Sequence, residues 1–224
     1  MDVLYFFKER TRFLRYFYDT AAAPFRATMR KIEAGEAPFD SPPYREDGEP
    51  PYLDEWVEAS EAVEVLGRSC LSVLSASLNL YFRTWEQEFP IRWADGERKR
   101  AFRNGYLEGY RNCFEAVLEQ SWEDCPADLA LVEQITLARN RDQHPDEIVT
   151  MRVNHARADL SKYPRPFFMS DFDRARLNEH DLEHGFLMNP SVDVSPERLE
   201  QAITETERLA SWLEEHLVAL RYER

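Results

Sequence analysis

Apolar residues recur at helical spacing over most of the chain. The longest pattern covers residues 53–89, where one stripe is formed by Leu53, Trp56, Val63, Leu66, Cys70, Leu74, Tyr81, Trp85 and Phe89. Similar spacing predicts helices at 2–33, 97–119, 126–143 and 196–221. The last of these has a serine and a proline suited to its N-cap and first position. The pattern therefore predicts an all-α bundle of long antiparallel helices.

Prolines and glycines interrupt this pattern at defined places. Pro24 is expected to kink or split the first helix, because a proline inside a helix removes one backbone hydrogen bond. Residues 35–51 carry most of the turn formers and are expected to form a long loop. Residues 146–196 show no clear period, although 146–155 is compatible with a short strand or helix.

Length and composition favour a single domain, 1–224. Residues 1–51 form an N-terminal helical extension with a proline-rich loop, and 52–224 form the bundle. Hydrophobic residues make up 43% of the 224 residues, which is enough for a core. No apolar run is expected to span a membrane, and the three cysteines show no CxxC pair. We therefore expect a cytoplasmic protein with reduced cysteines.

The net charge of −14 argues against a general DNA binder, because such proteins usually present a basic surface. The charge is unevenly placed, since residues 1–31 hold seven basic and three acidic residues, a net of +4 that leaves −18 elsewhere. This asymmetry predicts that the N-terminal segment packs against the acidic body, within one chain or between two. The same segment is aromatic on nearly all sides, so a cover from the core or a second subunit is expected.

A polar cluster is predicted where the helix at 126–143 ends. Arg139 follows Val132 and Ile135 on the apolar stripe, where an unpaired guanidinium is costly. Pro145 disfavours helical dihedrals at the residue before it, so the helix should stop near 143. That stop would let the His144 imidazole turn back toward Arg139.

The segment Arg139-Asn140-Arg141-Asp142-Gln143-His144 resembles the Arg-Asn-x-x-x-His signature of the HEPN (higher eukaryotes and prokaryotes nucleotide-binding) domain family. The order and length of the predicted helices are also similar to those of that family. The segment from 145 to 195 and the N-terminal additions depart from it. The resemblance implies a metal-independent ribonuclease without a cofactor, often with two copies of the motif meeting across a homodimer.

The three motif residues have the chemistry that RNA cleavage without a metal needs. Histidine titrates near neutral pH and can take the proton of a 2′-hydroxyl group, while arginine can stabilise charge developing on the phosphate. The resemblance implies that Arg139 and His144 are catalytic and that Asn140 supports them. A structural interpretation remains open, in which Arg139 bridges helix ends and His144 caps a helix.

A basic cluster lies at the start of the third predicted helix, 97–119, and consists of Arg98, Lys99, Arg100 and Arg103. Basic residues interleaved with Phe102 and Tyr106 are suited to phosphate contacts and base stacking on RNA. The competing interpretation, which we favour, is a solvated helix start whose arginines form salt bridges with the acidic body.

A weak zinc candidate is His180, Glu183 and His184, which match the His-x-x-Glu-His pattern of some zinc proteases. Short patterns of this kind recur by chance in acidic chains. The leading hypothesis is therefore an endoribonuclease of the toxin or phage-defence type. The alternative is a non-enzymatic HEPN-like module that binds a partner protein or a nucleotide. An antitoxin or regulatory protein is a further expected partner.

Overall fold

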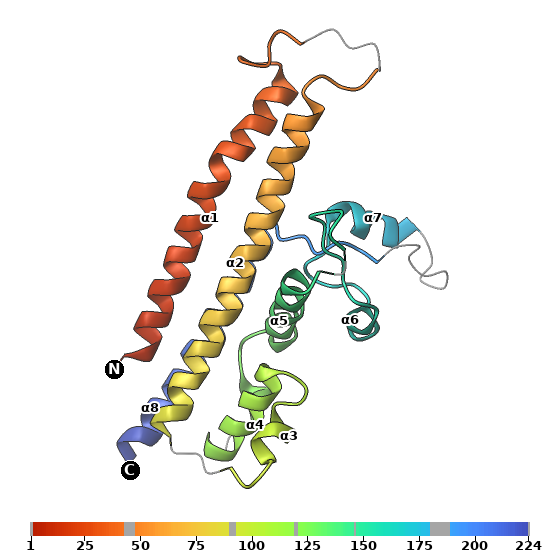
Figure 1. The fold of residues 1–224 in the computed structure, drawn as a ribbon. Helices are drawn as coiled ribbons and strands as arrows, with labels where there is room; N and C mark the ends of the chain where they lie inside the picture. Colours follow the sequence, from red (N-terminus) through yellow and green to blue (C-terminus); the bar gives the residue numbers. More distant parts are fainter. Residues whose placement is uncertain are drawn as a thin grey trace.

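The computed structural model describes residues 2–42, 48–89, 93–118, 121–145, 147–179 and 189–223. In these residues it contains helices and loops but no strand, which confirms the all-α class (Figure 1). The elements are α1 (Val3–Ala34), α2 (Leu53–Glu88), α3 (Glu97–Ala101), α4 (Tyr106–Leu118), a 3₁₀ turn (Trp122–Asp124), α5 (Leu129–Gln143), α6 (Arg157–Lys162), α7 (Asp171–Glu179) and α8 (Pro196–Glu223). Residues 146–196, where the sequence showed no clear period, contain two isolated antiparallel β-bridges among the described residues. One joins Asn154 to Ser191, and the other joins Met169 to Val192.

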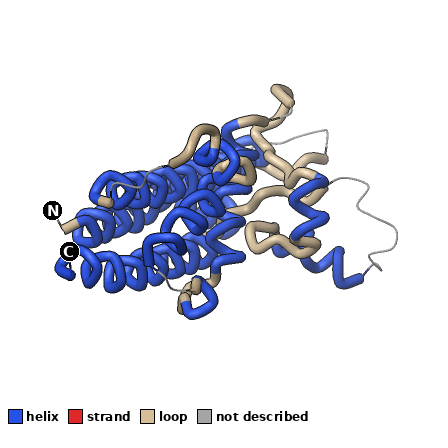
Figure 2. The backbone as a smooth tube through the Cα atoms, turned by 90° about the horizontal axis from the view of Figure 1, so that it is seen from below, coloured by secondary structure: helices blue, strands red, loops and turns tan. Residues whose placement is uncertain are grey.

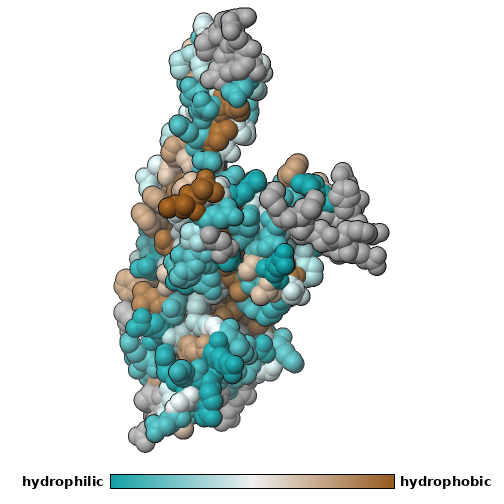
Figure 3. Space-filling view, turned by 45° about the vertical axis from the view of Figure 1, so that its right-hand side comes forward, coloured by the Kyte–Doolittle hydropathy of each residue, from teal (hydrophilic) through white to brown (hydrophobic). Residues whose placement is uncertain are grey.

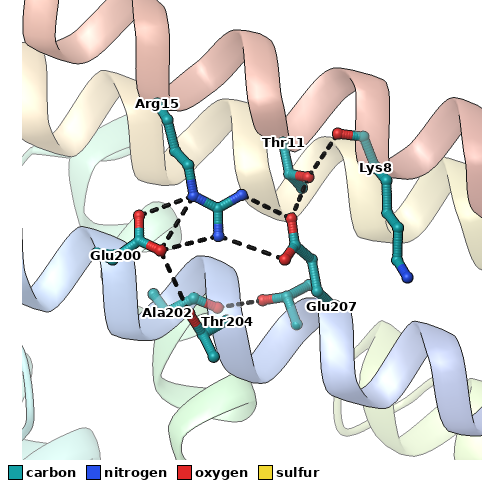
Figure 4. Close-up of polar contacts among 8 residues, drawn as sticks. Lys8, Thr11, Arg15, Glu200, Ala202, Thr204 and Glu207 are labelled. Atoms are coloured by element: carbon teal, nitrogen blue, oxygen red, sulfur yellow. Dashed lines mark hydrogen bonds and ion pairs between the residues drawn. The ribbon is translucent and has the colours of Figure 1, made fainter.

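Three long helices, α1, α2 and α8, form what we call the helical column. In Figure 1, α1 and α2 run in opposite directions, and Figure 2 shows the column helices side by side with both chain ends at one end. Arg15 joins α1 to α8 through Glu200 and Glu207, as the close-up in Figure 4 shows. The basic N-terminal segment thus contacts acidic residues within one chain, as its charge predicted.

Beyond the start of α8, α1 and α2 continue as a two-helix arm. The space-filling view shows this part as a narrow projection above a wider body (Figure 3). Pro24 was expected to kink or split the first helix, and the split is wrong, because α1 continues through the proline. Pro24 and Thr20, whose carbonyl has no N–H partner at the proline, are both exposed, so α1 passes through the proline on its solvent side.

The core consists of two buried clusters along the column. One surrounds Phe82 and Trp85 of α2 and reaches Phe114 of α4 and Leu213 of α8. The other surrounds Leu74 and includes residues of α1, α5 and α8. A Cβ at Gly67 would lie 2.6 Å from the Val194 carbonyl oxygen, so glycine permits the chain leading into α8 to cross α2 closely. Helix α2 thus contributes to both clusters.

The remaining helices, α3 to α7, form a side lobe against α2 and α8. The sequence predicted one helix at 97–119. The structure has two helices there, α3 and α4, so this prediction is wrong in its continuity. Gly105 has a φ of 114°, and the Phe102 ring turns back over α4. A Cβ at Gly109 would meet that ring at 2.5 Å. The packing of the Phe102 ring on α4 therefore accounts for the break between α3 and α4.

Helix α5 begins at Leu129, three residues after the predicted start, because Asp128 caps it by accepting a bond from Leu131 N (3.0 Å). By length and composition alone α2 is apolar enough to cross a membrane, contrary to the expectation that no segment is. Its most apolar window is 56% buried by the rest of the protein, a pattern that fits the core helix of a bundle.

Candidate functional site

The motif lies on the last turn of α5 and the residue that follows. Helix α5 ends at Gln143, and His144 is its C-cap with φ −132° and ψ 65°. The predicted end of the helix before Pro145 is confirmed. The His144 backbone nitrogen donates to the carbonyl oxygens of Asn140 (3.1 Å) and Arg141 (3.3 Å). These bonds fix the backbone of the motif independently of its side chains.

Arg139 lies on the edge of the buried face of α5. Val132 and Ile135 are buried, as the stripe predicted, whereas Arg139 is half-buried. One terminal nitrogen, Nη1, donates to Asn140 Oδ1 at 2.9 Å. The Nε atom is buried without a hydrogen-bond partner, and no described carboxylate forms an ion pair with this guanidinium. The cation therefore keeps hydrogen-bonding capacity and charge that the protein does not use.

The side chain of His144 is exposed, and within the described residues its imidazole makes no hydrogen bond or ion pair. Arg139 and Asn140 thus contact each other, whereas no described hydrogen bond joins the imidazole to either of them. The turn of the imidazole toward Arg139 stays a prediction.

A buried ion pair holds the end of α5 against α2. Arg68 is only 3% exposed, and its Nε lies 3.3 Å from Asp142 Oδ1. Its Nη2 donates to the Met151 carbonyl oxygen at 2.7 Å, and Ser72 Oγ donates to Asp142 Oδ2 at 3.1 Å. The sequence analysis missed this pair, although Arg68 lies between small residues on the longest apolar pattern. Asp142, the fourth residue of the motif, therefore has a structural role.

A cavity of about 530 Å³ opens beside the motif, between α4, α5 and the end of α6. Asn140 and Thr136 of α5 line it, together with Tyr106 of α4 and Tyr163 after α6. The Tyr106 hydroxyl lies 3.2 Å from Ser75 Oγ. Burial raises the pKa of Tyr106, so this hydroxyl stays protonated at neutral pH. This cavity brings one motif residue together with groups that the sequence did not connect to it.

A second cavity, of about 760 Å³, lies between α1 and α8 around Arg15. Glu200 and Glu207 already bind that arginine. We therefore regard the smaller cavity beside the motif as the better candidate, because the cation next to it is not neutralised.

The basic cluster of the sequence lies on and just after α3, in the side lobe. Arg98 forms a salt bridge with Glu86 (Nε to Oε1, 3.1 Å) and lies 4.5 Å from the centre of the Phe102 ring. Lys99, Arg100 and Arg103 are exposed. The Arg98 contact is the salt bridge to the body that the competing interpretation predicted. None of the four lines the cavity beside the motif.

The zinc candidate, His180, Glu183 and His184, lies outside the described residues. Among the residues that are described, no three His, Cys, Asp or Glu side chains are grouped so that they could hold a metal ion. Cys70 and Cys113 are buried, and burial raises their pKa to about 11 and about 12. Both thiols therefore stay protonated and unreactive at neutral pH.

Comparison with protein-family models, with curated proteins and with solved structures gave no match for this chain. The functional argument therefore depends on the geometry of the chain itself and on the resemblance of its motif.

Proposed function

We propose that the protein is a metal-independent endoribonuclease of the toxin or phage-defence type, with its site at the end of α5. The observation that carries this proposal is the half-buried guanidinium of Arg139, which has no described carboxylate partner and lies five residues before an exposed histidine. A guanidinium with free donors is suited to a phosphate oxyanion, and an exposed imidazole is suited to proton transfer. The resemblance to the HEPN signature assigns the same residues.

In the proposed reaction the His144 imidazole takes the proton of a ribose 2′-hydroxyl group. The 2′-oxygen then forms a bond to the adjacent phosphorus, the bond from phosphorus to the 5′-oxygen breaks, and that oxygen takes up a proton. Arg139 stabilises the negative charge on the phosphate oxygens, and Asn140 holds Arg139 in place. The products are a 2′,3′-cyclic phosphate and a 5′-hydroxyl group.

The test is cleavage of a labelled RNA by purified protein in the presence of EDTA. His144→Ala and Arg139→Ala are each expected to lower kcat/KM by at least about 100-fold, since acid–base groups contribute roughly 10²–10⁴-fold. Gln143→Ala is the matched control, because it changes another exposed side chain at the same helix end. Expression of the wild type, but not of His144→Ala, should arrest growth.

Equal cleavage by the wild type and His144→Ala would refute the ribonuclease. Loss of cleavage after EDTA treatment would refute its independence of metal ions. The proposal also places the protein in the cytoplasm, with RNA as substrate and an antitoxin or regulatory protein as partner. These parts are tested by cell fractionation and by co-purification from cells that express the inactive variant.

The alternative function is a helical module that binds a protein partner or a second copy of the chain. It is favoured by exposed side chains of α1 and α2 that we call the apolar patch, which consists of Phe6, Phe13, Phe17, Val73 and Leu80. Size-exclusion chromatography with light scattering tests the homodimer. Phe13→Glu should give monomers if the patch joins two copies, and an unchanged dimer would exclude it.

A further inference from the structure

The exposed side chains at the start of α1 differ in kind from the rest of this acidic chain, which has 42 Asp and Glu residues. The one acidic residue between Val3 and Tyr18, Glu9, is half-buried and bound to Arg12. The exposed side chains in that range are all aromatic or basic, namely Tyr5, Phe6, Lys8, Arg10, Arg12, Phe13, Tyr16 and Phe17. Aromatic residues and arginine are the types that protein interfaces favour over other surfaces.

Helix α2 continues this face beside α1. Its exposed residues between Gly67 and Gln87 form one row, at alternating spacings of four and three, that contains no carboxylate: Ser69, Val73, Ala76, Leu80, Arg83 and Gln87. Helices pack along one another through rows with this spacing. In the arm the same helix is acidic, with exposed Asp54, Glu55, Glu58 and Glu61. The lack of acidic residues is therefore a property of this face and not of α2 as a whole.

A groove of about 210 Å³ lies between the two helices within this face. Phe6 and Arg10 of α1 and Leu80 of α2 line it, and Arg10 Nε donates to Ser77 Oγ at 3.1 Å. The volume is below the roughly 300–1,000 Å³ of typical small-molecule sites. The groove therefore suits single apolar side chains of a partner better than it suits a metabolite.

The cations of this face are not neutralised by the protein. Lys8, Arg10 and Arg83 form no ion pair with a described carboxylate, whereas Arg15, on another side of α1, is bound by Glu200. In a chain with a net charge of −14, such cations beside an apolar groove are complementary to a partner that carries carboxylates.

Two other occupants fit this face less well. In a twofold dimer the same surface of two copies meets itself, which sets the cations Arg10 and Arg83 against like charges. A bilayer of anionic lipids would be repelled by the net charge of −14 on the whole chain. A separate acidic protein segment has neither disadvantage, and the spacing of the α2 row favours a helical one.

We propose that this face of α1 and α2 binds an acidic amphipathic helix of another protein. The apolar residues of that helix contact Phe6, Phe13 and Leu80, and its carboxylates lie against Arg10 and Arg83. The inference names the occupant of the apolar patch. It does not rest on the proposed ribonuclease, whose site is at the end of α5.

The test is a selection from a randomised library of 16-residue peptides displayed on phage. It uses the full chain with His144→Ala, so that expression does not depend on the proposed ribonuclease. We expect the enriched peptides to be acidic, with apolar residues at helical spacing. One of them is labelled with fluorescein and measured by anisotropy, and its circular dichroism should show a gain of helix on binding. The same peptide with glutamine in place of each acidic residue should bind at least tenfold more weakly.

Arg10→Glu and Leu80→Asn should each weaken binding of the selected peptide at least tenfold. Both side chains are exposed, so neither change opens a void in the core. Arg12→Glu is the matched control, because Arg12 is an exposed arginine of the same helix that does not line the groove. Circular dichroism and Tm establish that each variant is folded.

Enrichment of basic or uncharged peptides, or of none, would overturn the inference, as would equal binding by folded Arg10→Glu and Arg12→Glu proteins. A dimer that Leu80→Asn converts to monomers would assign the face to a second copy of the chain. Co-sedimentation with phosphatidylglycerol vesicles that Leu80→Asn abolishes would assign it to a bilayer. Either result would also overturn the inference. RNA cleavage should be equal in the wild type and Arg10→Glu, so loss of the ribonuclease proposal would leave this inference standing.

Discussion

The helical column and the side lobe use buried polar groups differently. In the column these groups are bonded across helices, as when the Tyr81 hydroxyl donates to the Ala210 carbonyl oxygen (2.8 Å) and contacts Glu214 (2.9 Å). Trp85 Nε1 donates to the same carboxylate at 2.9 Å. In the side lobe, Trp122, Thr136 and Arg139 each keep a buried polar atom without a partner. The α2–α8 contact of the column is therefore satisfied by cross-helix bonds, whereas these three atoms of the lobe are not bonded.

The bonded polar groups of the column contribute to stability, whereas the unpartnered groups of the lobe suggest a functional role. A satisfied polar network rigidifies the helices that it joins, whereas unsatisfied groups lower stability and are retained where they serve a ligand. The two unpartnered atoms of α1, Tyr18 Oη and Arg26 Nη2, belong to side chains stacked on each other, with the guanidinium carbon 5.1 Å from the ring centre. Those in the lobe instead belong to the cavity wall or lie next to it. This difference is why we assign function to the lobe.

The largest expected effect compares a leucine of the column with one of the cavity wall. Leu78→Ala should lower the free energy of unfolding by about 3 kcal/mol, because Leu78 is fully buried and its loss leaves a void. Leu137→Ala should cost about 1 kcal/mol, because Leu137 is only partly buried and already borders empty space. Urea denaturation measures both, and equal costs would contradict the distinction.

Next in size is the ion pair that joins the column to the motif. Asp142→Asn should lower the free energy of unfolding by about 2–3 kcal/mol, because Arg68 stays buried with its charge less well compensated. The Arg68→Met and Asp142→Asn double variant should recover part of this loss. A double-mutant cycle measures the coupling, and a coupling near zero would show that the pair does not hold α5.

A smaller effect is expected at the α1–α8 contact. Arg15→Gln should cost about 1 kcal/mol, since Arg15 binds two carboxylates but its side chain is 30% exposed and partly screened by solvent. Arg12→Gln is the control, because its pair with Glu9 is exposed and should contribute close to nothing. The difference between the two variants in chemical denaturation should shrink in 1 M NaCl.

The smallest effect is a pH dependence in the loop region behind α5. His155 is buried, its Nε2 lies 2.7 Å from the Phe168 carbonyl oxygen, and burial lowers its pKa below 6.5. At a pH below about 6.5 the unfolded chain therefore binds a proton that the folded chain does not, and stability falls as the pH falls.

His155→Gln should remove that acid sensitivity, since an amide does not titrate but can still donate to the Phe168 carbonyl oxygen. Tm measured from pH 8 to pH 5 checks this expectation. Parallel curves for the variant and the wild type would assign the acid sensitivity to other groups.

The sequence predicted the long helices because their ends carry local signals. Ser195 caps α8 by accepting a bond from Arg198 N (3.3 Å), and Pro145 follows the end of α5. The break between α3 and α4 was missed, because it depends on the Phe102 ring lying over Gly109 and not on a local pattern.

The site was predictable only in part, for the same reason. The motif and the unusual position of Arg139 can be found in the sequence. The cavity cannot, because Lys162 reaches back to Glu133 from almost thirty residues later in the chain. The Arg68–Asp142 pair likewise joins residues seventy-four positions apart. Contacts of this range carry no signal in the local pattern.

The start of α1 and the end of α8 lie at the same end of the column, where Leu4 N approaches Glu214 Oε1 at 3.4 Å (Figures 1 and 2). The loop between α1 and α2 lies at the opposite tip. A circular permutant that links the two termini and opens the chain near Gly48 would keep every helix intact. In this permutant α1 would become the last helix of the polypeptide. The motif helix and its cavity would then be synthesised before α1, which packs on the other side of α2.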